Sequence, residues 1–153
     1  MTDPGPPYID DAPLRRIGEG LLARSLPAAE WTHRAHLLAA LWLLCERPEL
    51  ELRRDLPGII WRYNEASGTA NTDSGGYHET ITQFYLLALG SCRARLPAGL
   101  PLHQQANRLL ASRFAARELP LDYWSRARLF SVEARRVWVP PDQAAFDFER
   151  IPL

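Results

Sequence analysis

The stretch WTHRAHLLAALWLLCE, residues 31–46, decides the fold of this chain. Thr32 can cap the start of a helix, because its hydroxyl accepts a hydrogen bond from a backbone N–H of the first turn. Residues 37–45 are nearly all apolar, and they cover most of the circumference of a helix that ends near Glu46. Such a helix belongs in a protein core, so this stretch predicts an all-α protein built around it.

Segments on both sides of this helix also carry apolar residues at helical spacing. In residues 49–66, the pair Pro57-Gly58 leaves two possibilities open: two helices, the second capped by Asp55, or one kinked helix. Near the carboxyl end, Asp122 and Ser131 can cap two short helices, and residues 142–153 are expected to be extended along the surface. The remaining helical segments are residues 14–25, 77–95 and 102–116.

The length of 153 residues fits one domain. Three prolines within the first seven residues indicate a disordered N-terminal arm over residues 1–8. We therefore expect a single helical domain over residues 9–153, with the architecture of an irregular bundle of about five to seven helices.

The charged residues exclude several functions. Eighteen basic and eighteen acidic residues cancel, whereas a general nucleic-acid binder carries a basic excess, so no nucleic-acid partner is expected. All eighteen basic residues are arginine. Without lysine, the chain can form neither a Schiff base nor a phosphate-binding loop of the GxxxxGK type.

Cysteine usage and hydropathy predict a cytoplasmic protein. Cys45 and Cys92 are isolated in apolar stretches and form no CxxC pair, so we expect free thiols in a reducing compartment. The longest apolar run, residues 37–45, is far shorter than the about 20 residues that span a bilayer. The first residues also lack the charged-then-apolar pattern of a secretory signal, and no membrane partner is expected.

Three of the four histidines fall in two clusters, His33 and His36 in WTHRAHL and His78 in GGYHET. Residues three apart on a helix share a face, so His33 and His36 can converge on one point. All three histidines lie in the first turn of a predicted helix, where the helix dipole disfavours a charged imidazole. A neutral imidazole can bind a metal or accept a proton.

These residues admit three interpretations. With Glu79 as a ligand or general base, His33, His36 and His78 form a chemically reasonable site for one divalent metal ion, zinc, iron or manganese. The same residues can also line a polar pocket without a metal, or they can be structural, as helix caps or buried hydrogen-bonded groups. The turn-rich loop 68–76 leads directly to His78 and is expected to form a wall beside the site.

A second polar group lies near the carboxyl end of the chain. The planar guanidinium groups of Arg126 and Arg135 can hold a carboxylate or a phosphate. Alternatively, these arginines form surface ion pairs with Asp122 and Glu133. The full group is Tyr123, Ser125, Arg126, Ser131 and Arg135.

The segments WTHRAHLLAALWLL, GGYHETIT and YWSRARLFSVEAR together resemble a bacterial family of small helical proteins. The family pattern is an aromatic residue, HRxH leading an apolar helix, then YHET, then a tyrosine-serine-arginine segment, and the resemblance covers residues 20–142. It implies a helical fold and the location of a site, but no particular activity. Many members carry an aspartate where this chain has Ala35, which weakens a carboxylate-rich metal site here. The matching positions are His33, His36, Tyr77, His78, Glu79, Thr80, Tyr123, Ser125 and Arg126.

The resulting hypothesis is a small-molecule-binding or metal-dependent protein with a buried His/His/His/Glu pocket. His33, His36 and His78 are the expected metal ligands, and Glu79 is a ligand or catalytic base. Arg126 is the expected substrate anchor, and the residues expected to contact the ligand are Tyr77, Tyr123 and Ser125. The alternative is a non-catalytic interaction module in which the cluster is a buried hydrogen-bond network, and a homo-oligomer is a candidate assembly.

Overall fold

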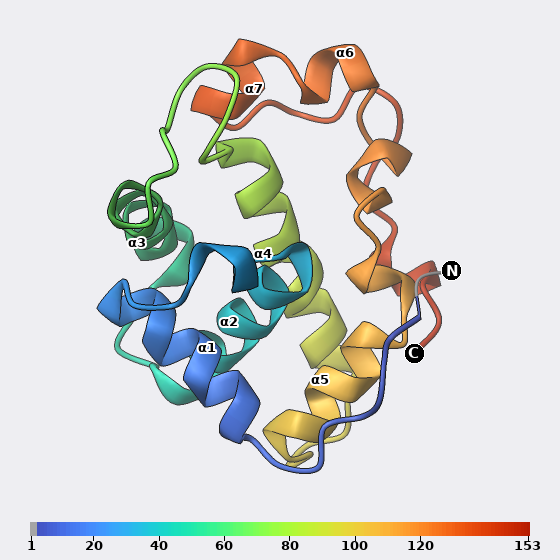
Figure 1. The fold of residues 1–153 in the computed structure, drawn as a ribbon. Helices are drawn as coiled ribbons and strands as arrows, with labels where there is room; N and C mark the ends of the chain where they lie inside the picture. The colour runs from blue at the N-terminus through green and yellow to red at the C-terminus, as the bar shows by residue number, and fades with distance from the viewer. Residues whose placement is uncertain (1–2) are drawn as a thin grey trace.

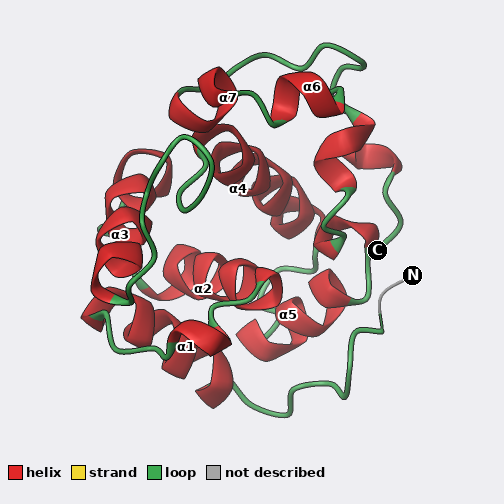
Figure 2. Cartoon of the chain, turned by 45° about the horizontal axis from the view of Figure 1, so that its top comes forward, coloured by secondary structure: helices red, strands yellow, loops and turns green. Residues whose placement is uncertain are grey.

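The central helix α2, His33–Glu46, is buried on nearly all sides, as its sequence predicts. Thr32 caps this helix, since its Oγ1 accepts a hydrogen bond from the Ala35 N–H at 3.2 Å. Residues 37–43 are all buried. In the computed structural model, which describes residues 3–153, the other long helices surround α2 (Figure 1, Figure 2).

The regular structure of the described residues consists of helices, which confirms the predicted all-α class and its five to seven helices. The α-helices are α1 (Ala12–Ala23), α2, α3 (Leu52–Ala66), α4 (Glu79–Arg95), α5 (Leu102–Leu110), α6 (Arg126–Leu129) and α7 (Val132–Arg136). Short 3-10 helices complete the chain, at η1 (Ala28–Glu30), η2 (Arg113–Ala115), η3 (Leu119–Asp122) and η4 (Phe148–Arg150).

Helices α1, α3, α4 and α5 all contact α2 and form the scaffold of the molecule. The contact between α1 and α2 is the most extensive. There, Gly18 lies so close to Trp42 that a Cβ added to the glycine would be 2.2 Å from the indole ring. Helices α3 and α4 also contact each other, and α4 contacts α7.

Helix α3 is continuous through Pro57, so the choice left open by the sequence resolves to one helix. Glu51 rather than Asp55 caps it, because the Glu51 carboxylate accepts from backbone N–H groups of the first turn. Proline has no N–H to donate to the carbonyl four residues earlier, which is that of Arg53. The side-chain amide of Gln83 on α4 donates to the Arg53 carbonyl instead, at 2.8 Å.

Two boundaries in the last third of the chain differ from the sequence prediction. Helix α5 ends at Leu110 rather than near residue 116, and a separate 3-10 turn follows it. Ser125, not Asp122, caps α6, because the Ser125 hydroxyl accepts from the Arg128 N–H at 3.2 Å. Ser131 caps α7 as predicted.

The final segment, residues 142–153, was expected on the surface, but its aromatic residues complete the core. Phe148 is buried, and its ring centroid lies 5.7 Å from that of Phe84 on α4. Phe146 stacks on Phe148 with centroids 5.1 Å apart. The expectation of an extended surface tail is therefore wrong for these side chains. The rings of Phe146 and Phe148 pack against Phe84, which lies in the core.

Residues 3–8, which belong to the arm predicted over residues 1–8, form no helix but contact the helical body. The Tyr8 N–H donates to Asn107 Oδ1 at 2.8 Å, and Asn107 Nδ2 donates to the Tyr8 carbonyl at 2.9 Å. Arg34 also donates to the Tyr8 hydroxyl at 3.1 Å. Residues 1–2 of the predicted arm lie outside the described residues.

Both cysteines are unpaired thiols. Burial raises the pKa of Cys92 to about 11, which keeps its thiol protonated at neutral pH. Within the described part of the chain, no helix combines the length and the apolar character needed to cross a membrane.

Candidate functional site

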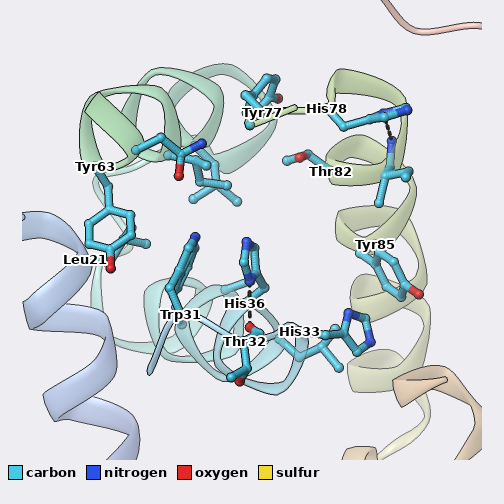
Figure 3. A pocket seen from close by; sticks show the side chains of 18 of the residues that line it. Leu21, Trp31, Thr32, His33, His36, Tyr63, Tyr77, His78, Thr82 and Tyr85 are labelled. Atoms are coloured by element: carbon cyan, nitrogen blue, oxygen red, sulfur yellow. Dashed lines mark hydrogen bonds between the residues drawn. The ribbon is translucent and has the colours of Figure 1, made fainter. Parts of the chain in front are cut away.

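A cavity of about 580 Å³ opens between α2, α3 and α4, and residues from both histidine clusters line it. The start of α2 forms its floor, α3 and α4 form two sides, and Tyr77 lies above (Figure 3). Segments far apart in the sequence therefore face one space. The polar and aromatic lining residues are Trp31, Thr32, His33, His36, Tyr63, Asn64, Ser67, Thr69, Tyr77, His78, Thr82, Tyr85 and Arg117.

The floor of the cavity is a stacked pair of rings, Trp31 and His36. Their centroids lie 3.8 Å apart, and their planes differ by 30°. His36 Nδ1 donates to the Thr32 carbonyl at 2.7 Å, because a carbonyl oxygen can only accept. In the neutral ring the proton is therefore on Nδ1, and Nε2 carries a lone pair. Figure 3 shows the outer nitrogens of both rings pointing into the cavity.

The indole N–H of Trp31 has no hydrogen-bond partner, and among the described residues it is the one buried side-chain polar atom in this state. The ring itself is held in place by Tyr63, whose centroid lies 5.2 Å away at a steep angle. The Tyr63 hydroxyl donates to the Leu26 carbonyl at 2.7 Å. A buried donor without an acceptor costs about 1–3 kcal/mol. The cavity thus presents a donor that the described protein groups leave unsatisfied.

Burial keeps the three cavity histidines uncharged at neutral pH. Loss of hydration is the main cause, and it lowers the pKa of His36 to about 4. For the same reason the pKa values of His33 and His78 lie below their usual value. The helix dipole predicts neutral rings, and burial is the main cause of the lowered pKa values of the three histidines in the structure.

His33 and His78 fasten the walls of the cavity to the chain behind them. His33 Nε2 donates to the Ala115 carbonyl at 2.9 Å, and His78 Nε2 donates to the Leu129 carbonyl at 2.8 Å. His78 Nδ1 accepts from the Ile81 N–H at 3.2 Å, which makes His78 the N-cap of α4. In Figure 3 the His78 ring points away from the middle of the cavity.

The predicted metal ligands His33, His36 and His78 are not arranged as a metal site. No group of three or more His, Cys, Asp or Glu side chains in residues 3–153 is placed to hold a metal ion. His78 has no lone pair left for a zinc, iron or manganese ion, because its Nδ1 accepts and its Nε2 donates to the backbone. The backbone carbonyls that hold His33 and His78 are the physical reason that the three rings do not converge.

Glu79, the predicted ligand or base, lies outside the cavity lining. Its Oε1 accepts from the Tyr77 hydroxyl at 2.6 Å and from the Gln83 amide at 3.3 Å. Burial, together with this carboxylate, raises the pKa of Tyr77 far above its usual value. Glu79 therefore orients Tyr77, and the predicted ligand-contacting Tyr77 does line the cavity.

The predicted residues Tyr123, Ser125 and Arg126 do not line the cavity. The Tyr123 hydroxyl donates to Asp147 at 2.7 Å within the aromatic core. Ser125 caps α6, and the guanidinium of Arg126 lies over the ring of Phe130, 5.6 Å from its centroid. The structure thus places Tyr123, Ser125 and Arg126 outside the cavity that the histidine clusters line.

The turn-rich loop forms part of the cavity wall, as predicted, through Thr69 and Gly76. Gly76 has a φ of +78°, and a Cβ there would lie 2.5 Å from the Ala70 carbonyl oxygen. Only glycine fits this position. Asn71 Oδ1 accepts from the Tyr77 N–H at 3.0 Å, which sets the path of the chain into the YHET motif.

Two arginines of α7 hold this loop from outside. Arg135, for which the sequence left open an anion clamp or a surface ion pair, instead donates to the carbonyls of Gly76 and Tyr77, each at 3.2 Å. Arg136 pairs with Asp73 through two hydrogen bonds of 2.6 and 2.8 Å. The carboxyl-terminal motif thus contributes to the cavity indirectly, by fixing its wall.

Sequence reasoning missed several lining residues. Tyr63 and Tyr85 lie at apolar positions of helical segments, and such spacing does not distinguish a core residue from a cavity residue. Thr82 lies four residues after His78, so helical spacing from the motif could have found it. Arg117 follows a 3-10 turn and carries no sequence signal. The missed residues that matter most for chemistry are Trp31, Tyr63, Thr82, Tyr85 and Arg117.

No protein-family model, curated protein or solved structure matches this chain. The resemblance to a bacterial helical family stays a prediction. The cavity itself is then the basis on which a function can be inferred.

Proposed function

We propose that this protein binds a small, uncharged organic molecule in the cavity between α2, α3 and α4. Its volume of about 580 Å³ lies within the about 300–1,000 Å³ typical of ligand pockets. Aliphatic and aromatic side chains supply most of its wall, with a few polar groups among them, and this is the usual lining of such pockets.

The observation that carries the proposal is the unpaired Trp31 N–H at the cavity floor. Nearly all buried polar groups in folded proteins have partners, so an unpaired one calls for an explanation. A ligand acceptor group placed above the floor removes the cost of the unpaired donor. The stack with His36 holds the indole in the orientation that such an acceptor requires.

The lining favours an uncharged ligand. The three histidines are neutral, and among the described lining residues Arg117 alone carries a full charge. Arg117 is exposed. Burying an ionised ligand group without a partner costs several kcal/mol or more, so charged molecules are disfavoured.

A second candidate function is a non-catalytic interaction module, in which the cluster serves as a hydrogen-bond network. The bonds of His33 and His78 to backbone carbonyls, and that of Glu79 to Tyr77, favour it. This function predicts that the cavity does not respond to small molecules.

We place either function in the cytoplasm, because unpaired cysteines suit a reducing compartment. The homo-oligomer stays a prediction.

The test follows the indole N–H signals of the ¹⁵N-labelled protein at pH 7.5 while quinoline, an uncharged aromatic acceptor, is added. Five tryptophans give five such signals, and Trp31→Phe identifies the one from Trp31. We expect the Trp31 signal to move downfield and to saturate, because a hydrogen bond forms. Benzoate, a charged aromatic molecule, is expected to leave it unchanged.

Two phenylalanine substitutions control for non-specific binding. Ala40→Phe fills the cavity from α2 and is expected to abolish the shift. Ala94→Phe adds the same ring to an exposed position of α4 and should retain it. If the Trp31 signal of the folded wild-type protein did not shift on addition of quinoline, the result would favour the interaction module.

A further inference from the structure

Two ring nitrogens at the cavity floor, Trp31 Nε1 and His36 Nε2, form a pair that we call the polar edge. The stack places their rings 3.8 Å apart, centroid to centroid, and both nitrogens point into the cavity (Figure 3). An indole N–H can only donate. His36 Nε2 can only accept, because the ring proton is on Nδ1 and bound to the Thr32 carbonyl. The polar edge therefore presents a donor beside an acceptor.

The tyrosine hydroxyls and the other histidines of the lining are already paired with the protein. The hydroxyls of Tyr63 and Tyr85 each donate to a backbone carbonyl at 2.7 Å, and that of Tyr77 donates to Glu79. The two remaining histidines of the lining also donate to backbone carbonyls. The polar edge thus dominates the recognition that the floor of the cavity can provide.

We infer that the cavity selects a flat molecule with a lactam or amide edge, whose carbonyl oxygen accepts from Trp31 Nε1–H and whose adjacent N–H donates to His36 Nε2. This inference rests on the proposed function and names the chemical class of its ligand. The carbonyl oxygen and the N–H of a lactam are neighbours, as are the two stacked ring nitrogens that point into the cavity. A single hydroxyl oxygen would have to face both nitrogens at once.

The remaining walls fit the apolar body of such a molecule. Ile60 from α3, Leu86 and Leu89 from α4 and Ala40 from α2 line the cavity beyond the floor. These side chains offer contact area but no hydrogen bonds, so they suit an aromatic ring fused to the lactam. A polyhydroxylated molecule would leave its hydroxyls unpaired there.

The experiment compares three probes of one shape at pH 7.5 by following the Trp31 indole N–H signal. 2-Quinolone carries both the carbonyl and the N–H. 1-Methyl-2-quinolone lacks the N–H, and quinoline offers only a ring-nitrogen acceptor. We expect 2-quinolone to bind about fivefold tighter than either, which corresponds to one additional hydrogen bond.

Substitution of Trp31 tests the donor of the polar edge, and the ¹⁵N signal of His36 Nε2 tests the acceptor. Trp31→Phe removes the donor and is expected to weaken the binding of 2-quinolone about fivefold. Ligand-detected NMR measures this affinity, because the variant lacks the Trp31 signal. Trp61→Phe, at a position 45 % exposed and outside the lining, should leave affinity unchanged. In the wild-type protein, the ¹⁵N signal of His36 Nε2 should move with 2-quinolone and stay in place with 1-methyl-2-quinolone.

The outcomes distinguish this inference from the function on which it rests. If all three probes move the Trp31 signal with equal affinity and His36 Nε2 is unaffected, the lactam inference is wrong while ligand binding stands. If none of the three moves the Trp31 signal of the folded wild-type protein, the proposed function fails and the inference fails with it. The wild-type measurements decide both points even if a variant does not fold.

Discussion

At the scale of single residues, the buried histidines make stability depend on pH. In the unfolded chain His36 takes up a proton below about pH 6.5, but in the folded protein only at about pH 4. Between these values the unfolded state binds more protons, so the free energy of unfolding decreases as the pH falls through this window. Above pH 6.5 this group adds no pH dependence. His33 and His78 act in the same direction.

His36→Asn tests this reasoning, because asparagine keeps an N–H for the Thr32 carbonyl but does not titrate. One pKa unit corresponds to about 1.4 kcal/mol, so between pH 6.5 and pH 5 His36 should account for on the order of 2 kcal/mol of the acid loss in the wild-type protein. Urea unfolding at pH 7.5, 6 and 5 measures the slope, which is expected to be shallower in the variant. His103→Asn, which removes a histidine outside the cavity lining, is the comparison variant. Equal slopes for wild type and His36→Asn would contradict the low pKa.

The sequence could locate the histidines but not their partners. His33 bonds to a carbonyl 82 residues away, and His78 bonds to one 51 residues away. Hydrogen bonds between residues so far apart in the sequence connect segments that only the tertiary fold brings together. Trp31 was missed for the same reason, because an N–H is known to be unpaired only when every neighbour is placed.

At the scale of the helices, the sequence predicted those helix N-termini that are capped by a hydrogen bond within the first turn. Thr32 and Ser131 cap α2 and α7 as predicted, since each accepts from an N–H three residues later. Asp55, a possible cap of a second helix, lies within the continuous helix α3. The helix continues through Pro57 because Gln83 of α4 donates to the Arg53 carbonyl, which lacks a proline N–H partner. Sequence alone does not show a compensating group from elsewhere in the fold.

A pair of glycines tests how closely α1 packs on α2. Gly18→Ala places a methyl group about where the Trp42 ring lies, at 2.2 Å, so we expect a loss of about 2–3 kcal/mol despite the better helix propensity of alanine. Gly90→Ala lies inside α4 with open space around it and should gain about 0.5–1 kcal/mol. Thermal and urea unfolding of both variants provide the comparison. A stabilised Gly18→Ala would show that the two helices are not this close.

The amide of Gln83 offers a second test between helices. Gln83→Leu leaves the Arg53 carbonyl without a donor and is expected to cost about 1–3 kcal/mol. Pro57→Ala restores a backbone N–H for that carbonyl, so Gln83→Leu should cost about 1 kcal/mol less in a Pro57→Ala background. Urea unfolding of the four proteins gives this coupling energy, and simple additivity of the two substitutions would rule out the compensation.

At the scale of the whole molecule, the carboxyl-terminal segment closes the core. Phe148 is buried against Phe84, and the Tyr123 hydroxyl bonds to Asp147 in the same segment. The sequence predicted a surface tail here, because residues 142–153 show no helical spacing. The tail fills core positions beside Phe84, Tyr123 and Trp124, which only the tertiary fold brings together.

Two phenylalanines provide the matched test of this closure. Phe148→Ala removes a buried ring and is expected to lose about 3 kcal/mol. Phe130→Ala, at a position 56 % exposed, should change stability by less than about 0.5 kcal/mol. Urea unfolding at pH 7.5 measures both. If Phe148→Ala were as mild as Phe130→Ala, the terminal segment would not belong to the cooperative core.

Under the proposed function, ligand binding beside the unpaired Trp31 N–H bears on how long the protein survives in a cell. A ligand that binds only the folded state stabilises it by about 2.7 kcal/mol at a hundredfold excess over its Kd. Changes of about 1–2 kcal/mol alter the abundance of a protein several-fold, because proteases remove the unfolded fraction. Under the proposed function, ligand binding would therefore couple the lifetime of the protein to the supply of the ligand. The protein would then accumulate where the ligand is present and be degraded faster where it is scarce.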